Sequence, residues 1–174
     1  MSTDSQKKWE GEAPAEPALR PPGWHDPRKK PVHGLIVIPD VPTIALVTVC
    51  TKDRVPWLAD QAVRSLLQIV WRDSTAWSVG RYVIMPDHIH LLARWGGSDV
   101  PLDRWVTYWK SQFTKRHQVA DHRWQPGHWD TRMRSREHTE SEWEYVSQNP
   151  VRAHLVRDVE EWPFQGVVEP WGWD

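Results

Sequence analysis

The chain has 174 residues and a formal net charge of −1 with 26% charged residues, which suits one domain with a hydrophobic core and excludes a polycation. Its single cysteine, Cys50, excludes a disulfide framework and a cysteine-based zinc site. No apolar run approaches the ~20 residues that cross a bilayer, and a signal-peptide pattern is lacking, so we expect a soluble, cytoplasmic protein.

The chain begins with a segment that is crowded with Pro, Ala, Glu and Lys and shows no periodicity. It predicts a disordered or loosely docked N-terminal arm over residues 1–32, before a domain over 33–166 and a tail over 167–174. Within the domain, a β-branched run over 43–51 predicts a buried strand. Apolar residues near helical spacing then predict a helix over 57–71.

Two extended pieces follow, over 77–85 and 87–95, and Pro86 marks a bulge, bend or edge between them because proline cannot donate to a strand ladder. An apolar stripe predicts a helix over 102–117, with Pro101 at its opening position. The stripe consists of Leu102, Trp105, Trp109 and Phe113.

The last third of the domain is less regular. Residues 121–135 are expected to form an irregular connection with a short strand. The segment "TESEWEYVSQNP" (139–150) predicts another helix, with a capping box of Thr139 and Glu142 at its start and a stop or kink at Pro150. This order of elements predicts an α+β fold with helices packed on one face of an antiparallel sheet.

Fourteen tryptophans stand out in the composition. Indole rings stack well on unpaired bases, which favours a nucleic-acid-binding surface. The alternative is that they fill the core, and we expect this for Trp57, Trp71 and Trp77, and for Trp105 and Trp109 in the apolar stripe.

Two histidines, His88 and His90, stand one residue apart in the strand-like run "VIMPDHIHLLARW". Because strand side chains alternate between faces, both imidazoles lie on one surface, and Ile89 and Leu91 lie on the other. Two ordinary histidines on a half-exposed strand are the alternative to a metal site. A metal site would need a further ligand from another element. If the strand pairing is regular there, Asp87 points to the opposite face and is a bend residue rather than a ligand.

The further ligand is expected from the last helix. Tyr145 and Asn149 are four residues apart and so share a helix face. Asn149 could lend its carbonyl oxygen to a Mg²⁺ or Mn²⁺ ion, and the Tyr145 hydroxyl is a possible covalent nucleophile toward a phosphate that the ion polarises. The alternatives are a tyrosine that only packs its ring and an asparagine that only ends a helix.

Two blocks of the sequence carry a family resemblance. "MPDHIHLL", followed by "YVSQNPVRAHLV" and "WPFQG", resembles the REP-associated tyrosine transposases, which are single-tyrosine members of the HUH (His-hydrophobic-His) endonuclease superfamily. The resemblance covers roughly residues 40–166. It implies a ferredoxin-like or RRM-like sheet, a metal pair of His88 and His90, and Tyr145 as the nucleophile. Asn149 stands where related transposases have a glutamine that completes the metal site.

The same resemblance implies a function. Such proteins are metal-dependent, single-stranded DNA endonucleases and transposases. They nick at or beside short palindromic hairpins (REP elements) of a bacterial genome through a 5′-phosphotyrosine intermediate and can rejoin strands. It therefore implies a nucleoid-associated protein, acting as a monomer or homodimer. Two alternatives stay open: a non-catalytic single-stranded nucleic-acid-binding module on the same fold, and a hydrolytic metalloenzyme in which His88 and His90 activate water.

A basic stretch interleaved with tryptophans favours DNA binding. Between Arg104 and Arg136, eight Lys or Arg residues face only Asp121 and Asp130, which suits a groove that follows a phosphate backbone with stacking platforms. A solvated helix face with core indoles is the alternative. The predicted DNA contacts are Arg104, Lys110, Lys115, Arg116, Arg123, Trp124, Trp129, Arg132 and Arg134.

Overall fold

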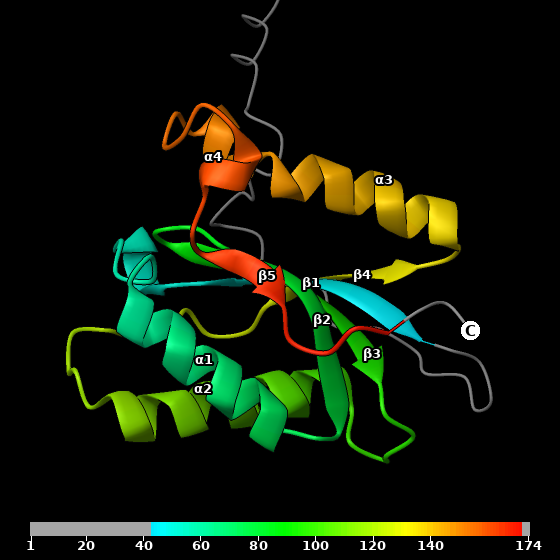
Figure 1. Ribbon diagram of the computed structural model, residues 1–174. Helices are drawn as coiled ribbons and strands as arrows, with labels where there is room; N and C mark the ends of the chain where they lie inside the picture. Colours follow the sequence, from blue (N-terminus) through cyan, green and yellow to red (C-terminus); the bar gives the residue numbers. More distant parts are fainter. Residues whose placement is uncertain (1–42, 172–174) are drawn as a thin grey trace, which may run out of the picture.

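The computed structural model describes residues 43–171, so the predicted N-terminal arm (1–32) and the last residues of the predicted tail lie outside the described part. Its centre is a five-stranded antiparallel sheet with strand order β4-β1-β3-β2-β5 (Figure 1). The strands are β1 (Ile44–Cys50), β2 (Trp77–Ile84), β3 (His88–Trp95), β4 (Trp129–Met133) and β5 (Gln165–Val167).

Two helices, α1 (Gln61–Asp73) and α2 (Leu102–His117), cover one face of this sheet (Figure 1). Helix α1 connects β1 to β2, and helix α2 connects β3 to β4, so the chain follows a β-α-β-β-α-β order. With β1 and β3 beside each other in the middle of these four strands, the arrangement is ferredoxin-like, as predicted. The helix predicted over 57–71 begins later, since Asp60 caps it by accepting hydrogen bonds from the Ala62 and Val63 amides.

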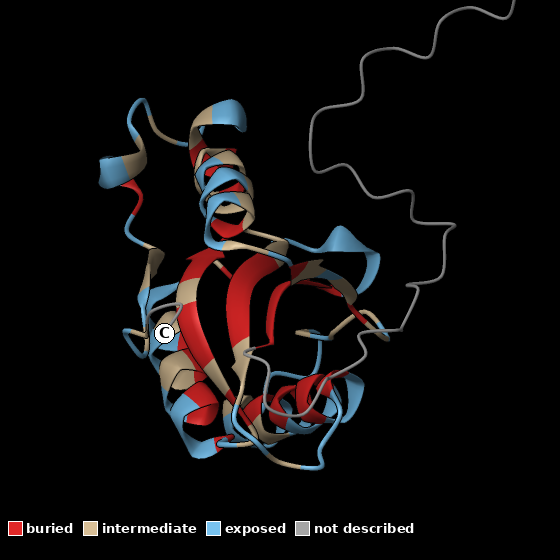
Figure 2. Cartoon of the chain, turned by 90° about the vertical axis from the view of Figure 1, so that its right-hand side faces the viewer, coloured by how far each residue is buried: buried red, intermediate tan, exposed pale blue. Residues whose placement is uncertain are grey.

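The main core lies between the sheet and these helices. Trp71, Trp77, Trp105 and Trp109 are each at most 1% exposed, and Trp57 is 7% exposed, which confirms their predicted place in the core. The three central strands, β1, β2 and β3, are largely buried (Figure 2). In the described part of the chain, no helix has the length and apolar character needed to cross a membrane.

A third helix, α3 (Arg136–Ser147), covers the opposite face of the sheet (Figure 1). Its residue Val146 packs in a cluster with Ile44, Leu46, Leu92 and Met133 of β1, β3 and β4. The prediction that helices pack on one face of the sheet holds for α1 and α2. Helix α3 forms a second helical layer on the other face. The reason is that every residue of β1 is buried, so the central sheet needs cover on both sides.

The start of α3 differs from the predicted capping box. Ser135 is the N-cap and its hydroxyl accepts a hydrogen bond from the His138 amide, whereas Thr139 lies inside the first turn and donates to the Ser135 carbonyl. The prediction that Thr139 caps this helix with Glu142 is therefore wrong. The predicted interruption at Pro150 is confirmed, because α3 ends at Ser147 and a short helix α4 (Asn149–Arg152) follows.

Substituting the observed cap tests this assignment. We expect Ser135→Ala to lower the free energy of unfolding by about 1 kcal/mol, because one amide at the start of α3 loses its acceptor. Urea denaturation followed by circular dichroism measures the change. Glu142→Ala serves as the control and should stay within about 0.5 kcal/mol of wild type. A larger effect of Glu142→Ala than of Ser135→Ala would restore the predicted capping box.

Candidate active site

The two histidines of β3 lie together on the α3 face of the sheet. Ile89 and Leu91 belong to the core under α1 and α2, and Leu92 belongs to the cluster under α3. Strand alternation therefore turns His90 toward α3, with His88 beside it. Their ring centroids are 4.8 Å apart at an interplanar angle of 89°. The prediction that the two imidazoles share one surface is confirmed.

Each imidazole is held through its Nδ1 atom. The Thr48 hydroxyl lies 2.8 Å from Nδ1 of His90, across the β1–β3 pairing. The Asp87 carboxylate lies 2.7 Å from Nδ1 of His88. A carboxylate or hydroxyl at Nδ1 orients the ring and sets Nε2 as the atom that would bind a metal. Contacts of this kind are typical of histidines that bind a metal through the other ring nitrogen.

Asp87 does not point where the sequence analysis expects it. Its position in a bend after Pro86 agrees with the prediction, but its carboxylate reaches back to His88 and also accepts from Nε of Arg54 at 2.7 Å. The reason is that β3 begins only at His88, so the alternation of a regular strand does not govern the residue before it. The regular pairing on which the predicted direction of Asp87 depended therefore does not extend to this residue, and its carboxylate lies beside His88.

Arg54 joins the supporting groups behind His88, and the sequence analysis did not identify it. Besides Asp87, its guanidinium reaches Sγ of Cys50 at 2.8 Å and Nδ1 of His88 at 3.4 Å. Arg54 has a left-handed backbone with φ of 58°, as does Asp53 with φ of 54°. Such conformations in residues other than glycine are unfavourable and concentrate at functional sites.

The electrostatics favour a neutral imidazole beside a carboxylate. Burial lowers the pKa of His88, against the hydrogen bond to Asp87, which raises it. Burial acts to raise the pKa of Asp87, but the hydrogen bond from His88 and the nearby Arg54 charge outweigh it and lower the pKa. Burial also raises the pKa of Cys50, which favours the neutral thiol. A neutral imidazole is the form that binds a metal.

The carboxyl end of α3 lies over the same end of the sheet as the histidines. An ion pair of 2.6 Å between Arg81 and Glu140 ties the first half of α3 to β2. One turn later, Trp143 packs against a cluster that contains Val83, and Val83 is the partner of His90 across the β2–β3 pairing. The helix therefore runs along β2 toward the histidines.

Tyr145 and Asn149 follow at this end, and Arg152 of α4 joins them. Its Nη2 atom donates to Oδ1 of Asn149 at 2.5 Å and also to the Tyr145 carbonyl, and its Cζ atom lies 4.2 Å from the centroid of the Tyr145 ring. Asn149 is buried, and Tyr145 is half-buried against the cluster of Val146. The sequence analysis missed Arg152, although it lies inside the motif "YVSQNPVRAHLV".

The donor set fits a divalent ion with open positions. Two imidazoles, backed by Asp87 and Thr48, supply the nitrogen ligands on one sheet face. Within residues 43–171 no three His, Cys, Asp or Glu side chains form a group that could hold a metal. A third protein ligand would therefore be an amide oxygen such as that of Asn149, which is bound to Arg152 in this structure.

Comparison with known proteins agrees with this picture. No family model matches the chain. The REP-associated tyrosine transposase of Escherichia coli (strain K12) is 30% identical over 107 residues, which cover 60% of this chain and 62% of that protein. A similarly named protein of Haemophilus influenzae is 30% identical over 94 residues, covering 47% and 53%. The predicted resemblance to the REP-associated tyrosine transposases is confirmed. The matched segments span less than two thirds of these two transposases.

A solved structure of such a transposase bound to a REP hairpin shares the fold. It has a TM-score of 0.61 and 23% identity to this chain and covers 82% of each chain. The α+β sheet described above is therefore the fold of a REP-associated tyrosine transposase.

The residues predicted to contact DNA differ in how far they are exposed to solvent. The exposed ones are Arg104, Lys115, Arg116, Arg123 and Arg134. Arg116 is ion-paired with Asp73 at 2.7 Å. Lys110 is buried, and its Nζ donates to the carbonyls of Gln125 at 2.5 Å and Gly127 at 3.0 Å. Burial lowers the pKa of Lys110 to about 8. The structure thus places Lys110 in the interior, as a support of the 125–127 loop.

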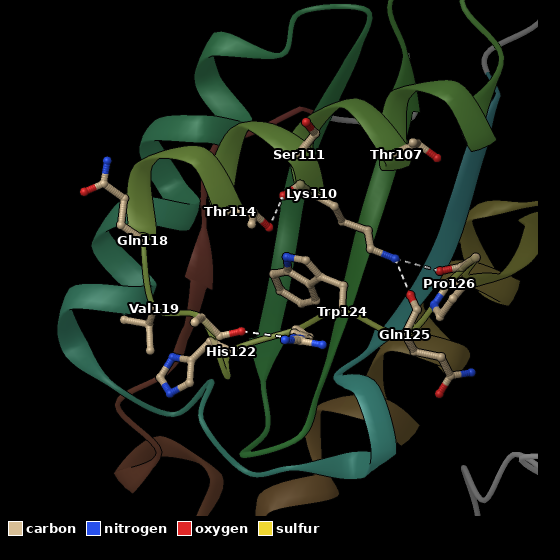
Figure 3. A pocket seen from close by; sticks show the side chains of 13 residues that line it. Thr107, Lys110, Ser111, Thr114, Gln118, Val119, His122, Trp124, Gln125 and Pro126 are labelled. Atoms are coloured by element: carbon tan, nitrogen blue, oxygen red, sulfur yellow. Dashed lines mark hydrogen bonds between the residues drawn. The ribbon is translucent and has the colours of Figure 1, made fainter.

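Arg123 and Trp124 line a hollow of about 730 Å³ between α2 and the segment that follows it (Figure 3). Figure 3 shows Lys110 reaching from α2 to the loop across this hollow. Trp124 packs partly into the main core, with its ring centroid 4.9 Å from that of Trp57. Its predicted role as a stacking platform is therefore limited to the part of the ring that the core leaves accessible.

Trp129 lies on the same sheet face as the histidine pair, with β1 between them. It is the partner of Thr48 in the β4–β1 pairing, and Thr48 is the partner of His90 in the β1–β3 pairing. Directly opposed residues of antiparallel strands share a face, so Trp129 and His90 lie on the same face of the sheet. Arg132 is half-buried opposite Ala45, on the side of the main core. The DNA contacts themselves stay predictions.

Proposed function

We propose that this protein is a metal-dependent, single-stranded DNA endonuclease and transposase that nicks at or beside short palindromic hairpins and can rejoin strands. The observation that carries the proposal is the pair of imidazoles on one sheet face, supported through Nδ1, with the carboxyl end of α3 and its Tyr145 over the same end. The names of the similar proteins and the REP hairpin in the solved complex agree with this substrate.

Tyr145 would be the nucleophile. Its phenol oxygen bonds to the scissile phosphorus as the bond from phosphorus to the 3′ oxygen breaks, and the phenol proton ends on the released 3′-hydroxyl. The 5′-phosphotyrosine conserves the phosphodiester, so attack by a 3′-hydroxyl reverses the step and rejoins strands. A Mg²⁺ or Mn²⁺ ion held by His88, His90 and Asn149 would supply charge neutralisation at the phosphoryl oxygens. Asn149 can serve this way only when its Oδ1 leaves Arg152.

The test is a denaturing gel with hairpin-bearing single-stranded DNA. With the label at the 3′ end and Mg²⁺ or Mn²⁺ present, we expect label to migrate with the protein, and none with EDTA. Free 5′-phosphate ends without an adduct would favour the hydrolytic alternative. Binding without any cleavage, unchanged by His88→Ala, would favour the non-catalytic module.

Trp129 gives a separate prediction about DNA binding. We expect Trp129→Ala to weaken binding to a hairpin with a single-stranded flank by about tenfold, since one base stacked on an aromatic ring contributes ~1–3 kcal/mol. Fluorescence anisotropy without metal measures the affinity. Tyr108→Ala is the matched control, because Tyr108 is 51% exposed on α2, which covers the opposite face. Equal effects of the two substitutions would contradict the stacking role.

A further inference from the structure

Arg152 is an exposed cation fixed beside the predicted nucleophile. Its guanidinium lies over the Tyr145 ring, with 4.2 Å from Cζ to the ring centroid, in the geometry of a cation–π contact. Its Nη2 atom bonds the Tyr145 carbonyl and Oδ1 of Asn149. Through these contacts the Arg152 side chain touches both the last turn of α3, at Tyr145, and the start of α4, at Asn149.

The rest of the guanidinium is available to a ligand. A guanidinium carries five N–H donors in a rigid, planar fork. Within the described residues, the side-chain hydrogen bonds of Arg152 all come from Nη2, so the N–H groups of Nε and Nη1 stay available on an exposed side chain. Hydrogen bonds from these charged N–H groups to a phosphate oxygen are among the stronger ones in proteins. No carboxylate forms an ion pair with Arg152 in residues 43–171.

We propose that Arg152 binds the DNA phosphate that Tyr145 attacks. The inference rests on the function proposed above and adds a substrate-binding residue to it. The contacts with the Tyr145 ring and the Tyr145 carbonyl hold the guanidinium beside the phenol, also when Oδ1 of Asn149 turns to the ion. The remaining N–H groups of Arg152 receive the phosphodiester there. Arg152 thereby couples phosphate binding to the position of the nucleophile.

The experiment compares Arg152→Gln and Arg152→Lys with Arg72→Gln as the control. Arg72 is exposed on α1, on the far face of the sheet, so Arg72→Gln removes the same charge at a distance. The first readout is the salt dependence of hairpin binding in EDTA. One lost phosphate contact lowers the slope of log K against log salt by about 0.7 for single strands. We expect this change for Arg152→Gln and none for Arg72→Gln.

The second readout is the rate of adduct formation at saturating DNA. We expect Arg152→Gln to lower it by about 100-fold. Arg152→Lys should keep the salt slope but lose most of the rate, because a lysine supplies the charge without the planar guanidinium that contacts Tyr145. An unchanged slope in Arg152→Gln, with wild-type folding by circular dichroism, would overturn the proposal. If wild type forms no adduct, the proposed function fails, and the salt slope still decides whether Arg152 binds phosphate.

Discussion

Tyr145→Phe is expected to abolish the covalent protein–DNA adduct, with the rate falling by at least about 10³-fold, the scale seen when a covalent nucleophile is removed. The substitution deletes only the phenol oxygen. The ring remains, so its packing against the Val146 cluster and its contact with Arg152 are retained. Hairpin affinity should therefore change by less than about threefold. Denaturing gels measure the adduct and fluorescence anisotropy measures the affinity.

The other two tyrosines supply the controls. The chain has three in all, and the structure describes each of them. Tyr82 is fully buried, and its hydroxyl accepts hydrogen bonds from Arg64 at 3.0 Å and Gln68 at 2.8 Å. Tyr108 is exposed on α2, on the opposite face of the sheet from the histidines. Tyr108→Phe should leave the adduct unchanged. An adduct of wild-type yield in Tyr145→Phe would show that another residue attacks the DNA.

The fold could be predicted to a large extent because its signals are local. The β-branched run that became β1 and the apolar stripe of α2 each identify one element from neighbouring residues. The cap of α3 could not be chosen correctly, since Ser135 and Thr139 both have side chains that suit a cap. The position of α3 on the second face of the sheet could not be predicted either, because it depends on both faces of β1 being buried.

The candidate site also has one part that local sequence predicts and another that depends on distant residues. Alternation along one strand is enough to place His88 and His90 on one surface. The groups that support them come from distant positions: Thr48 is 42 residues from His90 and Arg54 is 34 residues from His88. Such contacts depend on strand pairing and on a left-handed backbone, which no local pattern in this sequence reveals. Arg152 is different, because its distance in sequence from Asn149 is within one helical turn.

His88→Ala is expected to remove Mn²⁺ binding, with the affinity falling at least about 100-fold, because a site with two nitrogen ligands loses one of them. The adduct should disappear with it. The signal of free Mn²⁺ in electron paramagnetic resonance measures the affinity without any DNA. His138→Ala is the control, since His138 lies in the first turn of α3, at the end remote from Tyr145.

Asp87→Asn separates a ligand histidine from a merely structural one. An amide in place of the carboxylate keeps the shape but weakens the orientation of His88, and such outer contacts typically contribute ~10–100-fold to metal affinity. We therefore expect a graded series, with Asp87→Asn between wild type and His88→Ala in Mn²⁺ affinity and in adduct rate. If both variants bind Mn²⁺ as wild type does, the imidazole pair is not a metal site. If both bind weakly but form the adduct normally, the ion is not required for attack by Tyr145.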